Sequence, residues 1–360
     1  SPRALSLRFT TSPGLEDIVA LELGERLSGG EAVPGDTASA RIDAETGTEE
    51  PRPRTPDFEV ETRPLDLAGH VMLHTDRGTE ELRSLVSGLR SCFHVIRHIA
   101  FLPMQETEPL EALSEDLGRI DIDEMRTAAR FRVTSQRTGD HSFGSMDVQR
   151  VAGAALVDRY GTDVDLEHFD TEVRVDAVGD TWLVGVQWTR ESLDKRYDWV
   201  YRPRVTLRTN IAYAMLRLAE LPAEHAVLLD PFCGSGTIVI EAASIHPDVR
   251  CLAADRDPEA VSGTRANAEA AGLGARIEVR DADARDLDET YEPAFIDAVV
   301  TNPPYGIRLG RKTNYADLYR KFLTGAAYVV KPGGRVVVLV GKRRAAFNRV
   351  LREFGDLRIL

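Results

Sequence analysis

The segment Asp230-Pro231-Phe232-Cys233-Gly234-Ser235-Gly236-Thr237 follows an apolar run and precedes residues that favour a helix. Its glycines allow a tight turn and a close approach of the backbone to a ligand, and the helix start offers free N–H donors. A dinucleotide-binding loop would carry a third glycine at position 239, which is Val239. No Gly-Lys-Ser/Thr follows, which excludes a phosphate-cradling P-loop. An acidic residue directly before the loop would repel a phosphate but suits the ammonium group of a methionine moiety.

Strands and helices alternate on both sides of this loop. The expected strands are 226–230, 251–255, 276–280, 296–301 and 335–340, and the expected helices are 208–219, 237–245, 258–271 and 315–330. Such alternation predicts an α/β domain with a doubly wound parallel sheet, which binds ligands at the carboxyl ends of its strands. The chain ends at Leu360 inside an expected further strand, so we expect the closing hairpin strand of such a sheet to be missing.

Acidic residues mark the ends of successive expected strands. Asp255 ends the second strand, where it can accept hydrogen bonds from both hydroxyls of a ribose. Asp283, followed by Ala284, comes after the third strand and can accept a hydrogen bond from an adenine amino group. Asp257 is a weaker candidate because it can simply cap the next helix. Together with Asp230, these strand ends predict one adenosyl site and S-adenosyl-L-methionine (SAM) as the cofactor.

The expected fourth strand of this sheet ends in Asn302-Pro303-Pro304-Tyr305. The nitrogen of an aryl amine is a poor nucleophile because its lone pair is delocalised into the ring. The side-chain oxygen of Asn302 and a backbone carbonyl, which we take to be that of Pro303, can accept its two hydrogens and aim the lone pair at a methyl group. The prolines hold this backbone rigid, and Tyr305 can stack on an extruded base. The tetrapeptide therefore predicts methylation of the exocyclic amino group of a nucleobase.

Two other kinds of chemistry fit the sequence less well. Methylation at pyrimidine C5 needs a thiolate nucleophile, but no cysteine follows the tetrapeptide, and we expect Cys233 to serve packing. The pair His70/His74 and the group Cys92/His94/His98 have loose metal-ligand spacing without a complementary cluster elsewhere, so we expect no metal site.

The N-terminal half has a different pattern from the rest of the chain. Expected strands at 5–10, 130–136 and 182–188 and expected helices at 15–27 and 147–160 predict an α+β fold. Residues 31–57 are rich in Glu, Pro, Thr and Gly, which predicts a long solvated loop.

Composition and charge set limits on the location and partners of the protein. None of the apolar runs in the 360 residues approaches the roughly 20 residues that a membrane span needs, and the sequence shows no signal-peptide core. It has only three cysteines, which lie far apart in the sequence. We therefore expect a cytoplasmic location. The net charge of −13 opposes nucleic-acid binding at first sight. Basic residues nevertheless gather toward the C-terminal half, with six in 190–208 and seven in 331–352. The 40 arginines against five lysines fit either a salty cytoplasm or a GC-rich genome.

With these residues placed, the chain resembles the THUMP-domain tRNA (guanine-N2) methyltransferases, which modify the guanosine at position six of the acceptor stem. The resemblance runs nearly end to end. It rests on Thr10-Thr11-Ser12-Pro13-Gly14-Leu15-Glu16-Asp17, on Phe131-Arg132-Val133 with Gly139-Asp140-His141, on Ser192-Leu193-Asp194-Lys195-Arg196 and on Arg208-Thr209-Asn210-Ile211-Ala212. The loop at Asp230 and the tetrapeptide are shared with a wider set of amino-methylating enzymes, so they discriminate less. The acidity of the chain and its long acidic loop depart from the family, which weakens inference about RNA affinity but not about chemistry.

The resemblance implies a domain order and a set of partners. It implies a ferredoxin-like part with the acidic loop in 1–70, the rest of that part and a THUMP RNA-binding domain in 71–190, a linker in 191–207 and a Rossmann-like class I methyltransferase domain in 208–360. It further implies that the THUMP domain binds the CCA end of tRNA. We also expect contact with the acceptor stem, a monomer, and no DNA or membrane partner.

The residues and the resemblance together predict three groups of site residues. The cofactor group is Asp230, Gly234, Ser235, Gly236, Thr237, Asp255, Asp283, Ala284, Asn302, Thr209 and Asn210; the catalytic group is Asn302, Pro303, Pro304 and Tyr305; the RNA-binding group is Arg132, Arg137, His141, Arg196 and Arg308.

Several alternatives stay open on the sequence alone. The catalytic residues do not separate guanine-N2 methylation of tRNA from that of ribosomal RNA, or from adenine-N6 methylation of DNA. A non-catalytic RNA-binding module would predict a broken adenosyl site, yet Asp230, Gly234, Gly236, Asp255 and Asn302 are all present. A nicotinamide dehydrogenase is disfavoured by Val239. The target nucleotide, the oligomeric state and the need for a partner protein are not fixed by the sequence.

Overall fold

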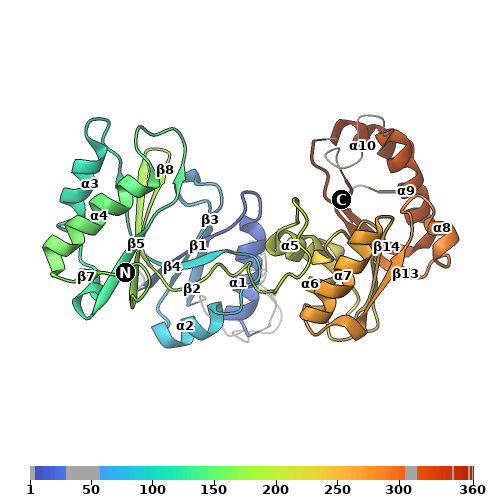
Figure 1. The fold of residues 1–360 in the computed structure, drawn as a ribbon, viewed down its shortest axis with the longest axis horizontal. Helices are drawn as coiled ribbons and strands as arrows, with labels where there is room; N and C mark the ends of the chain where they lie inside the picture. The colour runs from blue at the N-terminus through green and yellow to red at the C-terminus, as the bar shows by residue number, and fades with distance from the viewer. Residues whose placement is uncertain (1–4, 30–56, 305–313, 343, 356, 359) are drawn as a thin grey trace, which may run out of the picture. The chain divides into compact units, whose positions relative to one another are not determined.

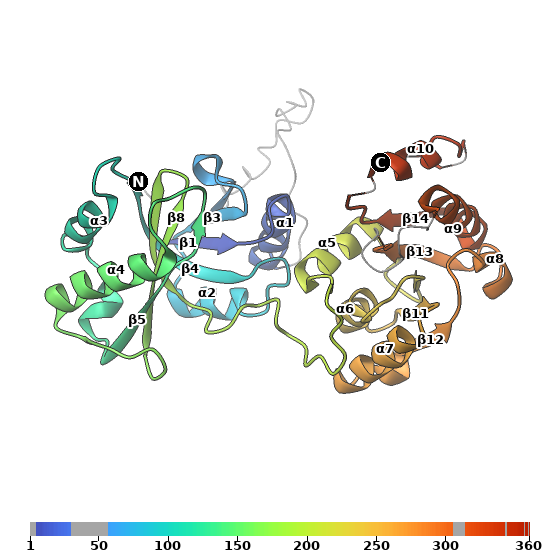
Figure 2. The same ribbon diagram turned by 45° about the horizontal axis from the view of Figure 1, so that its top comes forward.

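The computed structural model describes residues 5–29, 57–304, 314–342, 344–355, 357–358 and 360. The chain divides into two compact units, Ser1–Leu193 and Asp194–Leu360 (Figure 1 and Figure 2). Each unit has a sheet and hydrophobic cores of its own.

The first unit is built on one mixed sheet. Among its described residues the strands run in the order β2-β3-β1-β4-β9-β8-β5-β7, and β6 pairs with β8. The strands are β1 (Leu5–Thr10), β2 (Phe58–Thr62), β3 (His70–Thr75), β4 (His94–Pro103), β5 (Arg130–Thr134), β6 (Arg137–Thr138), β7 (Asp163–Val164), β8 (Thr171–Val178) and β9 (Thr181–Gln187); the helices are α1 (Glu16–Leu27), α2 (Thr79–Val86), α3 (Pro109–Leu117) and α4 (Ser145–Tyr160). Because β4 pairs with both β1 and β9, the sheet is continuous from the N-terminal strands to those of residues 130–187.

Apolar side chains from alternating strand positions pack against the helices on this sheet. Leu7 and Phe9 of β1 join a cluster with Leu23 of α1, whereas Trp182 of β9 joins a second cluster with Leu156 of α4. Figure 1 shows α3 and α4 side by side near β5 and β8, and these helices supply much of the second cluster.

A charged network is buried in the same sheet. Asp176 of β8 accepts hydrogen bonds from Arg8 of β1 at 3.0 Å and from Arg174 at 2.6 Å, and all three side chains are almost fully buried. Gly185 on β9 pairs with Arg174, and an added Cβ there would approach the carbonyl oxygen of Arg97 to 2.5 Å. The network therefore ties the first strand of the chain to a strand about 170 residues later, across β4 and β9.

The second unit is a parallel sheet in the order β12-β11-β10-β13-β14 with helices on both faces. The strands are β10 (Val227–Asp230), β11 (Arg250–Asp255), β12 (Ile277–Asp281), β13 (Ile296–Thr301) and β14 (Val330–Val338); the helices are α5 (Thr209–Ala219), α6 (Thr237–Ile245), α7 (Pro258–Ala270), α8 (Leu287–Thr290), α9 (Tyr315–Val329) and α10 (Arg344–Leu351). The strand order reverses between β10 and β13, and such a switch point opens a crevice at the carboxyl ends of the strands.

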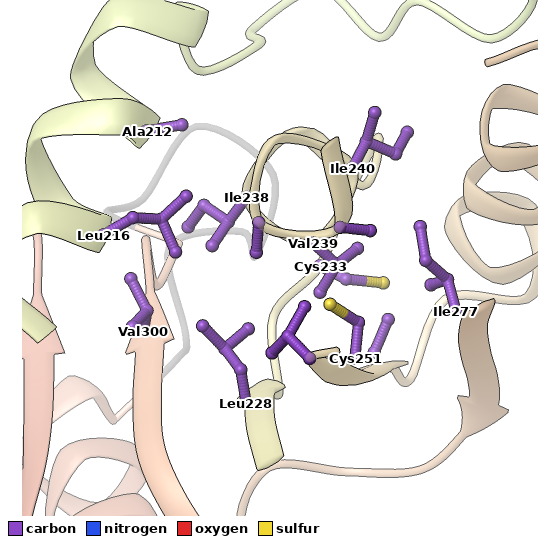
Figure 3. Packing of buried hydrophobic residues seen from close by; sticks show 14 of the residues in the cluster. Ala212, Leu216, Leu228, Cys233, Ile238, Val239, Ile240, Cys251, Ile277 and Val300 are labelled. Atoms are coloured by element: carbon purple, nitrogen blue, oxygen red, sulfur yellow. The ribbon is translucent and has the colours of Figure 1, made fainter. Parts of the chain in front are cut away.

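The packing of α6 explains why the loop before it is held in place. Ile238 and Val239 of this helix contact Leu228 of β10 and Val300 of β13 in one buried cluster (Figure 3). Cys233 and Cys251 belong to the same cluster, and both thiols are free. The sheet and α6 thus hold the connecting loop at the end of β10.

The structure corrects two expectations at the end of the chain. Strand β14 begins at Val330 rather than 335, because Val330 already pairs with Ile296 before an irregularity in the ladder. The prediction of a further strand near Leu360 is wrong for the described residues Leu357, Arg358 and Leu360. These residues pair with no strand among the described residues. The expected acidic loop falls almost entirely in 30–56, outside the described residues.

Candidate active site

A cavity of about 730 Å³ opens at the carboxyl ends of β10, β11 and β13 in the second unit. Its wall includes most of the predicted cofactor residues: Asp230, Gly234, Ser235, Thr237, Asp255, Asp283, Ala284 and Asn302. Pro303 and Pro304 also line it. The strand ends thus bring the predicted cofactor loop and the predicted tetrapeptide to one cavity.

The loop after β10 has the conformation that its glycines suggested. Gly234 and Gly236 have φ values of 54° and 83°, in the left-handed region that favours glycine. A Cβ on Gly236 would lie 2.8 Å from Cγ2 of Thr264 on α7, so this glycine allows the loop and α7 to pack closely. Gly236 itself is the N-cap of α6 and is not part of the cavity wall described here.

Asp230 is a buried acid at the base of the loop. Its Oδ1 accepts hydrogen bonds from the hydroxyl of Thr301 at 2.6 Å and from the amide of Phe232 at 3.1 Å. Burial raises the pKa of Asp230 to about 7, with a smaller contribution from the charge of Asp255, against the opposing effect of those two hydrogen bonds. The carboxyl group is therefore poised to titrate near neutrality.

The acids at the ends of β11 and β12 are already engaged by the protein. Asp255 accepts the amide of Gly234 at 3.1 Å through Oδ2 and that of Asp257 at 3.0 Å through Oδ1. Asp283 accepts Nε of Arg285 at 2.9 Å, and the hydrogen bonds from Arg285 hold its pKa below the ordinary value. Asp255 thus shapes the cofactor loop, whereas Asp257 caps α7 by accepting the amide of Glu259.

Asn302 carries an acceptor that the protein does not satisfy. Its Oδ1 is buried and has no hydrogen-bond partner among the described residues, although Asn302 lines the cavity. A buried polar atom without a partner costs about 1–3 kcal/mol, so this atom marks a place where a substrate donor would be accepted. Tyr305 of the tetrapeptide and Arg308 lie outside the described residues.

Besides Gly236, two other predicted cofactor residues do not reach the cavity wall. Thr209 donates its hydroxyl hydrogen bond to the carbonyl of Asp194 at 2.8 Å, and Asn210 is fully buried. The residues just before them, Val205 to Leu207, line the cavity instead, because α5 begins at Thr209 and the preceding extended segment passes the site. Sequence reasoning also missed Phe232, Arg256, Arg285, Asn314, Asp317 and Leu318, which line the cavity.

The described RNA-binding candidates differ in whether their side chains are exposed or already bound to other groups of the protein. Arg137 is exposed, and its guanidinium donates to the carbonyl of His141 at 3.2 Å. His141 is half-buried, and its Nε2 lies 2.7 Å from the carbonyl oxygen of Gly179. Arg132 is partly occupied by Glu172 at 2.9 Å and by the ring of Phe169. Arg196 forms a two-pronged pair with Glu241, whose side chain is fully buried, so the geometry assigns Arg196 to the packing of the second unit.

The structure shows packing rather than reactivity at Cys233. Burial raises the pKa of its thiol well above the ordinary value, and the sulfur contacts the hydroxyl of Thr264 at 3.5 Å. In the part of the chain that the structure describes, no cluster of three or more His, Cys, Asp or Glu side chains could hold a metal ion. None of the described helices is both long and apolar enough to cross a membrane.

Comparison with known proteins identifies the family. A model described as "RMKL-like, methyltransferase domain" matches residues 200–359, and one described as "THUMP domain" matches residues 109–187. The tRNA (guanine(6)-N2)-methyltransferase of Thermus thermophilus is 37% identical over 350 residues, which cover 96% of this chain and 91% of that protein. The chain belongs to the THUMP-domain tRNA (guanine-N2) methyltransferase family. It is therefore an enzyme, as the tetrapeptide predicted, and not a binding module alone.

Solved structures support the fold of this methyltransferase over nearly all of the chain. The crystal structure of TrmN from Thermus thermophilus superposes with a TM-score of 0.69 at 34% identity, covering 96% of this chain and 91% of that one. SMU.472, solved in complex with SAH, shares the fold with a TM-score of 0.69 at 18% identity, covering 97% and 93%. The predicted fold class, an N-terminal α+β part with a THUMP domain followed by a class I methyltransferase domain, is confirmed.

The methyl donor of this family member is SAM, as the sequence predicted. The cavity fits SAM on two observations that are independent of the comparisons. A buried carboxyl group, Asp230, stands at the start of the loop where a ligand ammonium would stabilise its ionised form. The unsatisfied Oδ1 of Asn302 lies in the wall of the same cavity, where the acceptor of the methyl group would be held.

Proposed function

We propose that this methyltransferase transfers the methyl group of SAM to the exocyclic N2 amino group of a guanosine in tRNA, at position six of the acceptor stem. The observation that carries the proposal is the buried, unsatisfied Oδ1 of Asn302 in the cavity that also contains the cofactor loop. The family relationship supplies the substrate, since the relative from Thermus thermophilus is a tRNA (guanine(6)-N2)-methyltransferase.

Asn302 and the two prolines act on the amino group. SAM supplies an electrophilic methyl group. Asn302 Oδ1 accepts one amino hydrogen and the backbone carbonyl of Pro303 accepts the other, which turns the nitrogen lone pair out of the ring plane. As the nitrogen gains positive charge, its hydrogens become stronger donors, so these hydrogen bonds stabilise the transition state more than the ground state. The ring constraints of Pro303 and Pro304 keep the acceptors in place.

The three strand-end acids hold SAM through different parts of the molecule. Asp230 stabilises the ammonium group, and Asp255 accepts from the ribose hydroxyls with the lone pairs left over from its two backbone hydrogen bonds. Asp283 and Ala284 flank the adenine. Ser235 and Thr237 line the cavity at the start of α6.

The first unit binds the RNA in this proposal. Arg137 and His141 of the THUMP part contact the CCA end, Arg132 contributes in part, and Tyr305 and Arg308 contact the target nucleotide. The protein acts as a cytoplasmic monomer. Because the net charge of the protein is negative, the RNA phosphates bind at local basic patches and not over the whole surface.

Product analysis tests the proposed reaction. The purified protein is incubated with SAM and an unmodified tRNA transcript that has guanosine at position six, and the digested nucleosides are separated by mass spectrometry. We expect N2-methylguanosine, and we expect its loss when position six is changed to adenosine. N6-methyladenosine, or N2-methylguanosine that persists after this change, would contradict the proposal.

A further inference from the structure

One carboxylate in the cavity wall accepts no hydrogen bond from the residues that the structure describes. Among the described lining residues, the acidic ones are Asp230, Asp255, Asp257, Asp283 and Asp317. The first four accept the hydrogen bonds given above from Thr301, Gly234, Glu259 and Arg285. The carboxylate of Asp317 accepts none from any described residue, and its only described ion-pair partner, Lys321, lies 3.7 Å away.

Asp317 is placed to face a ligand in this cavity. It lies in the first turn of α9, where Asn314 caps the helix by accepting the amide of Asp317 at 3.2 Å. Asn314 and Leu318 line the cavity together with Asp317, so this helix turn forms part of the wall that Asn302, Pro303 and Pro304 complete. The nearby guanidinium of Arg285 pairs with Asp283 and forms no described hydrogen bond with Asp317, although the charges of Arg285 and Asp317 attract each other.

The tetrapeptide does not by itself distinguish a guanine from an adenine, because both present an exocyclic amino group. The two bases differ in the ring nitrogen next to that group: N1 of guanine carries a hydrogen, whereas N1 of adenine is an acceptor with a lone pair. A carboxylate beside the amino-group acceptors would therefore bind guanine and repel adenine.

We propose that Asp317 selects the target base by accepting the N1–H hydrogen of guanine while Asn302 holds the N2 amino group. This role rests on the proposed function, because it presupposes a purine amino group at Asn302. Asp317 would then be the residue that confines a general amino-methylating site to guanine.

A base analogue tests this role separately from the overall reaction. 2-Aminopurine keeps the N2 amino group but has an acceptor at N1. Single-turnover methylation is measured with tRNA transcripts that carry guanine or 2-aminopurine at the target position, with wild type and with Asp317→Asn. We expect wild type to prefer guanine by about 10- to 100-fold, the discrimination of one specific base contact. Asp317→Asn should lose most of this preference, because its amide can donate to N1 of 2-aminopurine.

Two further variants keep the result interpretable. Asp288→Asn removes an exposed acid from the first turn of α8, outside the cavity wall, and should leave the preference unchanged. If Asp317→Asn methylates neither base, Asp317→Glu decides: a retained guanine preference supports the role, and equal rates on both bases overturn it. A wild-type preference in Asp317→Asn also overturns it, whereas failure of wild type to form N2-methylguanosine overturns the proposed function itself.

Discussion

The carboxyl group of Asp230 contacts the surrounding strand and loop, and it also lines the cavity. Its burial and its hydrogen bonds from Thr301 and Phe232 fix it between β10 and β13, and its pKa of about 7 follows mainly from that burial. In the proposed function a ligand ammonium lies next to this group and favours its ionised form, which would couple cofactor binding to loss of the proton.

This coupling predicts a pH dependence of cofactor affinity. Below a pKa of about 7 the carboxyl group is mostly protonated, so affinity for S-adenosylhomocysteine should rise as the pH increases from 5.5 to 7.5. The ligand's own amino group stays largely protonated over most of this range. Calorimetry at several pH values measures the affinity, and buffers of different ionisation enthalpy report the released proton. Asp230→Asn should bind more weakly and without this dependence; constant wild-type affinity across the range would exclude the coupling.

Single residues were predicted from the sequence where a strand end fixed their position. Asp230, Asp255, Asp283 and Asn302 were found in this way, and all four line the cavity. Asp317 was missed because it stands in a helix turn 15 residues after Asn302, and only the packing of α9 brings it to the cavity. A helix-start aspartate is common for electrostatic reasons alone, so the sequence carried no separate signal.

Secondary-structure elements were predicted best where the alternation of strand and helix was regular. The bounds of α6 and β13 are those expected, since an apolar run and a glycine loop delimit them. Strand β8 was missed: its buried side chains include Glu172, Arg174 and Asp176, which read as surface residues in the sequence. Glu172 pairs with Arg132 of β5 and Asp176 pairs with Arg8 of β1, both far away in the chain, whereas Arg174 pairs with Asp176 on the same strand. Only the tertiary structure therefore explains the burial of these charges.

The buried network on β8 predicts a large loss of stability. Asp176→Ala leaves the guanidinium groups of Arg8 and Arg174 buried without their shared carboxylate. We expect the free energy of unfolding of the first unit to fall by about 3–5 kcal/mol, the usual cost of breaking a buried ion pair from one side. Urea unfolding followed by native-state hydrogen exchange in β1 and β8 measures this loss.

A surface pair serves as the control for this substitution. Glu115 at the end of α3 and Arg119 in the turn after it form an exposed pair, with side chains that are 70% and 73% exposed. Glu115→Ala should change stability little, because exposed pairs are screened by solvent. Equal effects of the two substitutions would show that the buried network does not hold the sheet together.

At the scale of the whole molecule, the proposed function assigns RNA recognition to the first unit and methyl transfer to the second. The THUMP match at 109–187 and the methyltransferase match at 200–359 fall in different units. We therefore expect a tRNA transcript without its CCA end to be methylated more slowly than the complete transcript, while the affinity for S-adenosylhomocysteine stays the same. Single-turnover rates with both transcripts measure the difference.

A pair of arginine variants connects this effect to the first unit. Arg137→Ala should reduce the advantage of the complete transcript, because Arg137 is an exposed candidate contact. Arg119→Ala removes an exposed arginine of the same unit that already pairs with Glu115, and should leave the advantage unchanged. Equal rates for wild type with and without the CCA end would contradict the proposed division of labour.

The role of Asn302 is tested most directly by the rate of the chemical step. In Asn302→Ala, affinities for tRNA and S-adenosylhomocysteine should stay near those of wild type, because the lost hydrogen bond acts mainly in the transition state. The single-turnover rate of N2-methylguanosine formation should fall by a factor that corresponds to about 2.7–4 kcal/mol, the cost of removing one preorganised hydrogen-bonding group. A near wild-type rate in Asn302→Ala, with both affinities intact, would contradict amino-group activation by Asn302.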